Sequence, residues 1–491
     1  MSRLTSAFIA LDHAAPEPLY RQLYQCLRDA ILTAQSPPGT PIPSSRELAR
    51  ELGIARNTVL TAIEQLRAEG YLQGERGSGT YVNDVLPEDL SRARAIAGPV
   101  GRRGAIRYRL SARATRLTAT RLPQLPAGLP KPFRPAVPAL DAFPFKLWAG
   151  LVQRRWKQRP TELLGFGDPI GYLPLRRAVA SYLSGARAVQ CEAEQVIIVS
   201  GAQQALDITA RVLIDPGDAV WMEEPGYPGA REAFAAAGAR IIPVPVDSAG
   251  INIQMGITRC AAARLAYVTP SRQFPLGVTL TLARRLELLH WSRRAHAWLV
   301  EDDYDSEYRY SSRPIASLQG LDRDGRVIYV GTFSKVLFPS LRLGYLIAPA
   351  ALVDTFTAAR IIAAGQPPLI EQAVLAEFIT EGHFGRHLRR MRTLYEERRG
   401  ILFTEVRRVL AGFLDLAAAE AGLDVIGRLP PGVDDHQAAA RAAAVGVETA
   451  PLSMFRRKPG KQEGLLLGFA AFAPHDIRSG VERLARALQG T

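Results

Sequence analysis

The sequence predicts an α+β winged helix-turn-helix domain followed by a larger α/β domain with a mostly parallel sheet and helices on both faces. Two observations lead to this prediction. Residues 16–83 place apolar positions at helical spacing, separated by helix caps and breaks. Residues 131–491 alternate short β-rich runs with longer helical stretches. At 491 residues the chain also exceeds one ordinary hydrophobic core and should hold two or more domains.

The N-terminal domain opens with a predicted helix over residues 18–34. Its apolar residues recur every four positions, as Leu19, Leu23, Leu27 and Ile31, which predicts one buried face. A second helix follows, with Ser44 or Ser45 as its N-cap and Gly53 at its end. The third helix runs from Ala55 or Arg56 to Glu69 after a tight turn. This spacing is typical of a helix-turn-helix.

The third helix begins with residues that can read DNA bases. Arg56, Asn57 and Thr58 form its first turn, and first-turn side chains of a recognition helix reach base edges. Arginine can bond guanine with two hydrogen bonds, and asparagine suits adenine. The segment ERGSGTYV at 75–82 then fits a short β-hairpin wing, in which a glycine lets the backbone approach a phosphate.

These segments together resemble the DNA-binding domain of GntR-type bacterial repressors. The resemblance rests on PLYRQL, PSSRELA, ARNTV, LRAEGYL and GSGTYV within residues 18–83. It implies DNA contacts from Arg46, Arg56, Thr58 and Gly79. With the helix-start residues included, the candidate DNA-binding residues are Ser44, Arg46, Arg56, Asn57, Thr58 and Gly79. Each arginine taken alone is more often an ordinary helix-surface charge, so the prediction depends on the joint pattern.

Residues 84–130 are predicted to be a linker. From Ser91 to Pro130 the chain has nine arginines and no acidic residue, with several prolines and glycines. Such a segment buries little and is expected to be an extended or mobile tether. It is either a solvated connection alone or a connection that also attracts DNA phosphates.

The bulk composition bounds the partners and the compartment. A net charge of +14 favours polyanions such as nucleic acid, although an arginine-rich composition by itself explains it too. Cys26, Cys191 and Cys260 have neither metal-ligand nor disulfide spacing, so we expect no metal and a reducing cytoplasm. The sequence contains no run of ~20 apolar residues and no cleavage-like N-terminal site, so we expect neither a membrane span nor a signal peptide.

The C-terminal domain carries the residues that a pyridoxal 5'-phosphate site needs. Lys335 follows the strand VIYV and can present its amine to an aldehyde. Asp302 ends the strand AWLVED, and a carboxylate there can keep a pyridine nitrogen protonated. Tyr304 can donate a hydrogen bond to the ring hydroxyl. Tyr227, in EEPGYPGA, can stack on the ring face.

A phosphate cradle is predicted at the start of the helix that follows the strand QVIIV. Free backbone N–H groups and the helix dipole there favour an anion. The residues predicted to form the cradle are Ser200, Gly201, Ala202, Gln203, Thr332, Ser334 and Arg342. Each of these features is common by itself, and the prediction depends on their order in one chain.

The ordered segments SGAQQ, EPGYPG, EDDYDSEYRY and TFSK…LRLGY resemble fold-type I aminotransferases, and specifically the MocR subfamily of GntR regulators (the GabR and PdxR type). The resemblance covers residues 131–475. It implies a Schiff base on Lys335, Asp302 on the pyridine nitrogen, Tyr304 on the ring oxygen and Arg342 on the phosphate. It also implies a head-to-tail homodimer, in which each winged domain lies against the partner's aminotransferase-like domain and the dimer reads two DNA half-sites.

Three positions depart from that pattern. Phe274 stands where aminotransferases carry an asparagine that bonds the ring oxygen, and Arg272 stands where such regulators typically have histidine. Leu466, in GLLLGFA, stands where aminotransferases place a carboxylate-binding arginine. The losses at 274 and 466 should weaken transamination more than cofactor binding.

Three functions remain open from the sequence. The first is a transcriptional regulator that binds pyridoxal phosphate and responds to the cofactor or to an amine or amino-acid effector. The second is an active aminotransferase fused to a DNA-binding domain, which Phe274 and Leu466 disfavour. The third is a DNA-binding protein whose C-terminal domain is only a dimerisation scaffold, which the presence of Lys335, Asp302 and Arg342 disfavours.

Overall fold

The computed structural model describes residues 9–33, 35–75, 79–86, 109–118, 128–159, 161–310, 315–457, 460 and 462–489. The chain divides into two compact units, residues 1–109 and residues 110–491. Most of the predicted linker, residues 87–108 and 119–127, lies outside the described part, as does the tip of the predicted wing at residues 76–78.

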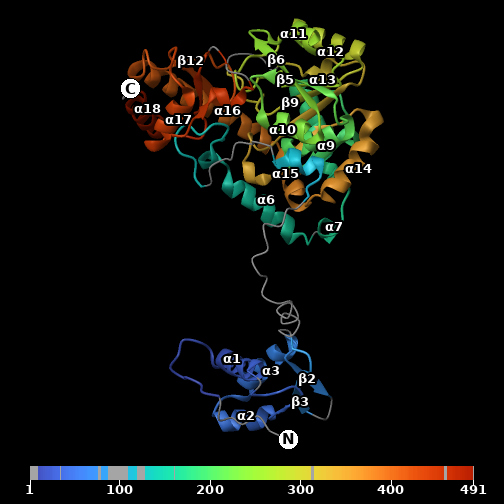
Figure 1. Ribbon diagram of the computed structural model, residues 1–491, viewed down its shortest axis with the longest axis vertical. Coiled ribbons are helices and arrows are strands. Elements are labelled where there is room, and N and C mark those ends of the chain that lie inside the picture. The colour runs from blue at the N-terminus through green and yellow to red at the C-terminus, as the bar shows by residue number, and fades with distance from the viewer. Residues whose placement is uncertain are drawn as a thin grey trace. The chain divides into compact units, whose positions relative to one another are not determined.

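The N-terminal unit contains the predicted helices and hairpin (Figure 1). Its elements are α1 (Leu19–Leu32), β1 (Pro41–Ile42), α2 (Ser45–Leu52), α3 (Arg56–Ala68), β2 (Leu72–Glu75) and β3 (Gly79–Val82). The strands form an antiparallel sheet in the order β1-β3-β2. Ser44 caps α2 by accepting a hydrogen bond from the Glu47 backbone at 3.2 Å. Gly53 ends α2 with φ 66°, a backbone conformation that glycine adopts without strain.

The core of this unit is built by the helical spacing seen in the sequence. Leu23, Leu27 and Ile31 of α1 are fully buried, together with Val59 and Leu66 of α3. Leu19, the first residue of α1, is only partly buried, so the apolar face of the helix begins one turn later than its spacing predicts. The helix-turn-helix therefore rests on a continuous apolar layer between α1 and α3.

The second unit begins with α5 (Ala112–Thr118), a short helix inside the predicted linker. The Arg116 guanidinium donates to the Ala236 carbonyl at 3.5 Å, so α5 contacts the helix α10 (Pro228–Ala237). At α5 the linker thus differs from the extended chain that its composition predicts, because this short helix packs against α10.

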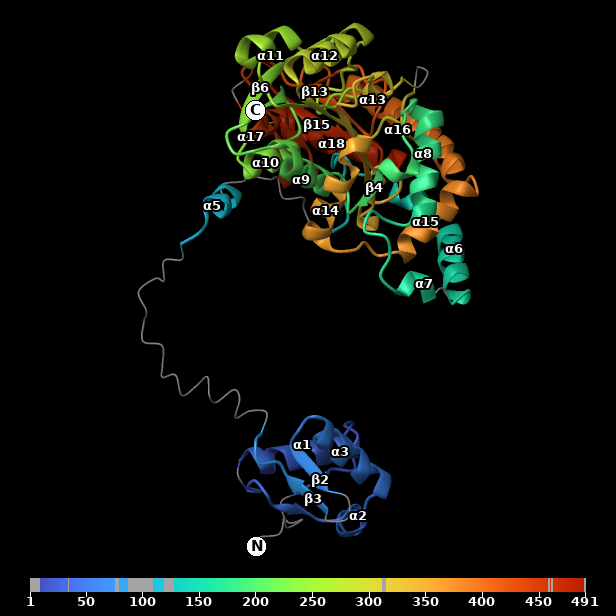
Figure 2. The ribbon, with the colours of Figure 1, turned by 90° about the vertical axis from the view of Figure 1, so that its right-hand side faces the viewer.

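A large sheet with helices on both faces forms the centre of this unit (Figure 2). The strands are β4 (Val196–Val199), β5 (Ala219–Glu224), β6 (Arg240–Asp247), β7 (Gly250–Ile251), β8 (Leu265–Val268), β9 (Trp298–Asp303), β10 (Val327–Thr332) and β11 (Gly344–Ile347). Their order is β4-β11-β10-β9-β8-β5-β6-β7. The central strands β10, β9, β8, β5 and β6 are parallel, while β11 runs antiparallel to both β4 and β10.

Alternating side chains of the strands pack on opposite faces, as a sheet covered on both sides requires. In β10, Ile328 and Val330 join the cluster under α9, α10 and α14, whereas Tyr329 joins the cluster under α8 and α15. In β5, Val220 faces the first of these layers and Trp221 faces α11 and α12. The bounds of these helices are α8 (Leu173–Arg187), α9 (Ala202–Leu213), α11 (Ile253–Cys260), α12 (Leu282–Ala295), α14 (Val353–Ala364) and α15 (Ile370–Thr380).

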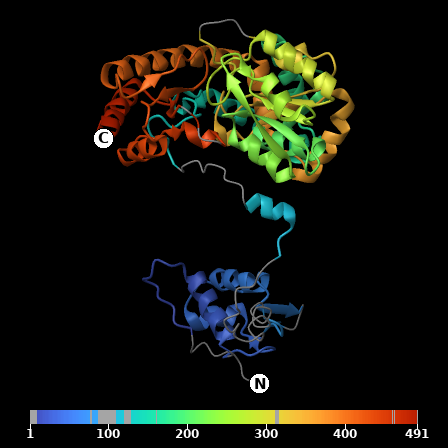
Figure 3. The ribbon, with the colours of Figure 1, turned by 45° about the horizontal axis from the view of Figure 1, so that its top comes forward.

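A smaller antiparallel sheet, with its own helices, follows the large one and lies beside it (Figure 3). Its strands are β12 (Asp415–Leu416), β13 (Asp424–Arg428), β14 (Ala450–Pro451) and β15 (Gly464–Gly468), in the order β12-β13-β15-β14. Its helices are α16 (His383–Val409), α17 (Asp435–Ala444) and α18 (Pro474–Gln489). The remaining helices of the unit are α6 (Phe145–Lys157), α7 (Thr161–Leu164) and α13 (Leu318–Leu321).

The predicted fold class is confirmed: an N-terminal winged helix-turn-helix is followed by a mostly parallel sheet between helical layers. Within the described residues, none of the helices combines the length and the apolar character that a membrane crossing requires.

Candidate functional site

Loops from several strands meet at one edge of the large sheet. The strands β5, β8, β9 and β10 are parallel, and β4 runs in the same direction because β11 lies antiparallel to both β4 and β10. Their carboxyl ends therefore share an edge, which is where α/β folds bind ligands. Most of the predicted site residues lie in the segments that follow these strands, at 200–203 after β4, 225–227 after β5, 304–305 after β9 and 333–335 after β10. Asp302 and Thr332 lie at the ends of β9 and β10, and Arg272 and Phe274 lie in the segment after β8.

Lys335 presents its amine in a partly buried position just after β10. Its Nζ donates to the Ala136 carbonyl at 2.7 Å. Burial lowers the pKa of Lys335, although the Asp424, Asp305 and Asp302 carboxylates act in the opposite direction. A lowered pKa increases the fraction of neutral amine, which is the form that attacks an aldehyde.

Asp302 lies near the end of β9 with only 4% of its surface exposed. Its Oδ2 accepts a hydrogen bond from the Tyr267 hydroxyl at 2.7 Å, while its buried Oδ1 has no partner among the described residues. Burial raises the pKa of Asp302 to about 7. A buried acceptor without a donor is costly, so Oδ1 fits a ligand that brings an N–H group.

The predicted phosphate cradle brings Arg342 against the start of α9. Gly201 is the N-cap of α9, with φ 113°, and a Cβ atom there would lie 3.6 Å from the nearest guanidinium nitrogen of Arg342. A Cβ atom at Gly344 would lie 3.0 Å from the Gly201 Cα, so these two backbones touch. Ser334 donates its backbone N–H to the Thr332 hydroxyl at 3.1 Å. The arrangement combines a helix N-terminus with an exposed cation.

Tyr227 and Gln203 are joined on the same side of the site. The Tyr227 hydroxyl lies 3.5 Å from Gln203 Oε1, and Gln203 Nε2 donates to the Gly229 carbonyl at 3.0 Å. A Cβ atom at Gly229 would lie 2.4 Å from the Tyr227 ring, so a larger residue there would displace this ring. Tyr227 is the N-cap of α10, in the segment that follows β5.

Tyr304 is held by Arg272. The Tyr304 hydroxyl donates to the Arg272 carbonyl at 3.0 Å and accepts from Arg272 Nη1 at 3.0 Å. Arg272 also pairs with Asp305 at 3.1 Å and with Asp424 at 2.6 Å, and all three of these charged side chains are nearly completely buried. Arg272 is therefore the centre of a buried ionic network that reaches from the large sheet to β13 of the small one.

Phe274 and Leu466, two of the positions that depart from the aminotransferase pattern, belong to one apolar cluster. Leu466 is 1% exposed and clusters with Phe455, and the ring of Phe274 meets the ring of Phe455 with centroids 5.1 Å apart. Phe274 also packs edge-on against Tyr227 at 5.9 Å and against Tyr304 at 6.0 Å. The site wall that carries polar anchors in aminotransferases is hydrophobic in this chain.

Several site residues escaped the sequence reasoning. Tyr267, which binds Asp302, lies inside a predicted strand and carries no motif. Asp305 stands three residues after Asp302, in a segment where only Asp302 and Tyr304 were predicted to bind the cofactor. Asp424 is 152 residues from its partner Arg272. Glu223 is also buried near the site, accepts from the Thr269 hydroxyl at 2.6 Å, and has its pKa raised to about 7 by burial.

In the N-terminal unit, the predicted DNA-contacting side chains are accessible. Ser44, Arg46, Arg56 and Asn57 are exposed, and Thr58 is partly buried at the first turn of α3. Arg56 Nε donates to the Ser45 hydroxyl at 3.3 Å, which ties the start of α3 to the start of α2.

An arginine of α3 that the sequence analysis did not single out lies against the wing of this unit. Arg67 of α3 donates to the Thr80 hydroxyl at 2.6 Å. A Cβ atom at Gly74 would lie 2.2 Å from the Arg67 guanidinium, so the arginine lies directly on the β2–β3 hairpin. Gly79, the first residue of β3, is exposed with φ 112°. Arg67 thus places a cation beside the wing.

Family comparisons match both units. The model of bacterial regulatory proteins of the gntR family matches residues 19–82, and the model of class I and II aminotransferases matches residues 146–456. The chain is thus a helix-turn-helix regulator with an aminotransferase-like domain.

Relatives with the same organisation cover almost the whole chain. The probable rhizopine catabolism regulatory protein MocR of Rhizobium meliloti is 43% identical over 98% of this chain and 96% of its own. The pyridoxine biosynthesis regulator PdxR of Corynebacterium glutamicum is 30% identical over 96% of each chain. The chain belongs to the MocR type of GntR-family transcriptional regulators.

Solved aminotransferase structures share the fold of the second unit. LysN, the α-aminoadipate aminotransferase of Thermus thermophilus complexed with N-(5'-phosphopyridoxyl)-L-leucine, superimposes with a TM-score of 0.68 at 30% identity, over 73% of this chain and 92% of its own. The kynurenine aminotransferase of Pyrococcus horikoshii gives a TM-score of 0.68 at 25% identity, over 82% of this chain and 98% of its own.

Proposed function

We propose that this regulator binds pyridoxal 5'-phosphate through a Schiff base on Lys335 and changes its DNA binding in response to the cofactor or to an amine or amino acid. The observation that carries the proposal is the unpartnered, buried Oδ1 of Asp302. A protonated pyridine nitrogen would give this oxygen a donor and would stabilise the charged carboxylate. Lys335 carries a nearby positive charge that acts on the Asp302 carboxylate.

The cradle and the aromatic residues would hold the rest of the cofactor. Ser200, Gly201, Ala202 and Gln203 offer backbone N–H groups at the start of α9, and Thr332, Ser334 and Arg342 add hydroxyls and a cation. Tyr227 would lie against the ring. Tyr304 would donate to the ring oxygen by exchanging its bond to the Arg272 carbonyl. When bound, the cofactor supplies an aldehyde for an amine and an electron-withdrawing ring.

Turnover by this site should be weak or vestigial. Phe274 offers no hydrogen bond to the ring oxygen, and Leu466 offers no cation to a substrate carboxylate. Without these anchors the reacting groups are poorly oriented, and orientation supplies a large part of catalysis. Transamination of common amino acids at ordinary enzyme rates would instead favour the active aminotransferase fused to a DNA-binding domain.

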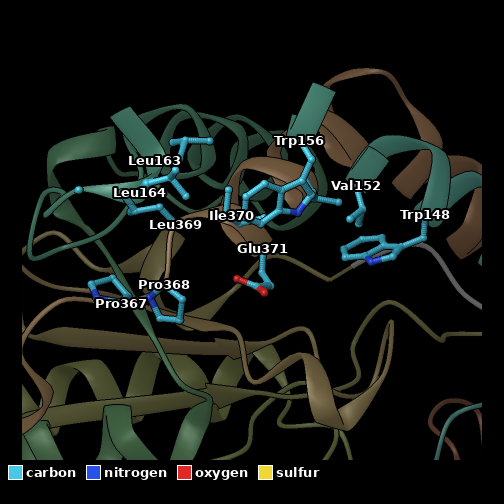
Figure 4. A pocket seen from close by; sticks show the side chains of 12 residues that line it. Trp148, Val152, Trp156, Leu163, Leu164, Pro367, Pro368, Leu369, Ile370 and Glu371 are labelled. Atoms are coloured by element: carbon cyan, nitrogen blue, oxygen red, sulfur yellow. The ribbon is translucent and has the colours of Figure 1, made fainter. Parts of the chain in front are cut away.

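We also propose that the protein acts as a homodimer, in a head-to-tail arrangement, on an operator with two half-sites in the cytoplasm. An apolar surface on the second unit supports a dimer. Trp156 and Leu164, exposed by 51% and 61%, line a cavity of about 440 Å³ between α6, α7 and α15 (Figure 4). Phe166, two residues after Leu164, is 96% exposed. Apolar surface of this kind is typical of protein interfaces.

The covalent link can be tested directly. Wild-type protein incubated with pyridoxal phosphate should show a visible absorption band and should retain the cofactor after borohydride reduction and denaturation. Lys335→Ala should lose the retained label and keep its fold. Lys157→Ala, at the exposed end of α6, should label as the wild type does and serves as the matched control. Retention of label by Lys335→Ala would show that another amine carries the cofactor.

A further inference from the structure

The proposed cofactor contacts do not include the apolar wall formed by Phe274, Phe455, Leu466, Ile426 and Leu452. The ring of Phe274 stands between Tyr227 and Tyr304, both of which are proposed to contact the cofactor. Leu466 and Leu452 are almost fully buried behind it, at 1% and 2% exposure. A ligand bonded to the cofactor next to Tyr227 and Tyr304 would therefore meet hydrocarbon surface.

None of the described residues that form the wall carries a positive charge that could pair with a carboxylate on such a ligand. The two terminal nitrogens of Arg272 are already paired with Asp305 and Asp424. Its Nε lies close against the backbone of Gly422, where a Cβ atom would be only 2.2 Å away, so this nitrogen is covered as well. Placing an ionised carboxylate on apolar surface without a paired charge is unfavourable, because the group loses its hydration and gains no partner.

Two other arginines follow Phe455 in sequence. Arg456 and Arg457 line a groove together with Arg231 and Arg240, and none of the five wall residues lines that groove. Arg457 and Arg231 also line a narrow pocket with Phe455 and Tyr227, but neither Phe274 nor Leu466 lines it. The arginines of this segment therefore line cavities that Phe274 and Leu466 do not reach.

We propose that the effector of this pocket is a primary amine with an apolar body and no carboxylate beside its amino group, selected by the wall of Phe274, Phe455 and Leu466. This inference rests on the proposed function. The amine nitrogen would replace Lys335 Nζ on the aldehyde carbon of the cofactor: one C=N bond forms as the other breaks. The two protons of the incoming amine pass to Nζ, so nothing is oxidised or reduced.

A matched pair of ligands tests the inference, because 2-phenylethylamine and phenylalanine differ only in the carboxylate. Each is titrated into the protein loaded with pyridoxal phosphate, while the visible band of the lysine-bound cofactor and the affinity for operator DNA are followed. We expect 2-phenylethylamine to change the visible band and the operator affinity at a concentration at least about tenfold lower than phenylalanine does. A tenfold difference corresponds to roughly 1.4 kcal/mol of binding free energy. Equal or tighter binding of phenylalanine would overturn the inference and leave the proposed function standing.

Variants of the wall sharpen the test. Leu466→Arg should reverse the preference towards phenylalanine, and Leu466→Met, which keeps the wall apolar, should retain the wild-type preference. If Leu466→Arg does not fold, Phe274→Asn replaces it, because Phe274 is only partly buried. Phe274→Asn should weaken binding of 2-phenylethylamine several-fold more than binding of methylamine, which has no apolar body to contact the wall.

The outcomes separate the two proposals. A selectivity that stays the same in Leu466→Arg and in Phe274→Asn would assign the discrimination to other residues and overturn the role of the wall. If the wild-type protein forms no visible band with pyridoxal phosphate, the cofactor does not bond to the chain. The proposed function and this inference then both fail.

Discussion

Arg272 Nη2 donates to the Asp424 carboxylate at 2.6 Å and to the backbone carbonyl of the same residue at 2.7 Å. Arg272 stands in the loop after β8 of the large sheet, and Asp424 is the first residue of β13 in the small sheet. The same guanidinium holds the Tyr304 hydroxyl. One side chain thus connects the ligand edge of the large sheet to the C-terminal sheet, which carries Leu466.

Arg272→Ala should therefore destabilise the second unit strongly. The substitution leaves Asp305 and Asp424 buried without their counter-ion, and breaking a buried pair in this way costs about 3–5 kcal/mol. The measurement is denaturant unfolding of the cofactor-free protein. Arg428→Ala is the matched control, because its partner Asp415 lies 3.9 Å away and both side chains are exposed, at 54% and 80%.

The control pair should contribute less than about 1 kcal/mol, as exposed ion pairs do. Equal losses in Arg272→Ala and Arg428→Ala would show that the network around Arg272 contributes no more than a surface pair.

Sequence reasoning predicted the parts of this site that are local in the chain. Ser200–Gln203 and Lys335 follow apolar strands, and Asp302 lies near the end of one. Parallel strands bring their carboxyl ends together, so the pattern alone predicts that these residues share one edge. The partners of Arg272 could not be found this way, because Asp424 belongs to a different sheet and lies 152 residues further on. Pairing over such a distance depends on tertiary packing, which has no periodic signal.

The strands of the large sheet show the same limit of prediction from sequence. The runs at β4, β5, β6, β8, β9 and β10 are long or β-branched enough to predict strands, and strands are found there. The run GYLI of β11 is only four residues long, and it closely follows Arg342, which was predicted to bind the phosphate. In the structure it lies between β4 and β10 and runs antiparallel to both. Its direction follows from the short connection after β10, which returns the chain along the same strand.

Stability of the cofactor-free protein should depend on pH through Asp302. Burial raises the folded-state pKa of this carboxyl to about 7, against an ordinary value of about 3.9. The folded chain then binds a proton that the unfolded chain has lost, so this contribution to stability is complete below about pH 4 and is lost as pH rises towards about 7.

Asp302→Asn should remove that loss, and its free energy of unfolding should therefore fall less than that of the wild type between about pH 4 and about pH 7. Denaturant unfolding at several pH values measures the difference. Pyridoxal phosphate should also flatten the wild-type curve, because a ring N–H on Oδ1 favours the charged carboxylate. Parallel curves for wild type and Asp302→Asn would contradict a raised pKa at this position.

Arg56→Ala should weaken specific operator binding by about 1–3 kcal/mol if this arginine reads a base pair with two hydrogen bonds. Arg56 opens α3 and is exposed, with Ser45 as the described partner of its Nε. Gel-shift titrations on operator and on unrelated DNA at one salt concentration measure the loss of specificity.

Arg21→Ala is the control for this experiment. Arg21 lies on α1 with 63% of its side chain exposed and pairs with Glu17 at 3.5 Å, so its loss removes a charge of the same kind from another helix. We expect operator affinity close to wild type for Arg21→Ala. Unchanged operator binding in Arg56→Ala would remove α3 as the base-reading helix.

Cofactor binding in the second unit should change DNA binding by the first. A ligand changes DNA affinity only if it binds the DNA-competent and DNA-incompetent states with different affinity. Bonding of the cofactor to Lys335 would supply that difference, because it would fix Asp302, Tyr304, Tyr227 and the start of α9 around one rigid ring. These groups are attached to different strand ends, so ordering them tightens the whole edge of the sheet.

Saturating pyridoxal phosphate should therefore change operator affinity by about 1–3 kcal/mol, the usual range of allosteric coupling. Lys335→Ala should lose most of this response and keep its basal DNA binding, because the substitution lies in the second unit and leaves α3 intact. Titration of both proteins on one operator at one salt concentration, with and without cofactor and the phenyl ligands, measures the coupling. Since linkage is reciprocal, operator DNA should change the affinity for pyridoxal phosphate by the same factor. If the cofactor does not change operator affinity and the operator does not change cofactor affinity, the pocket has no regulatory role.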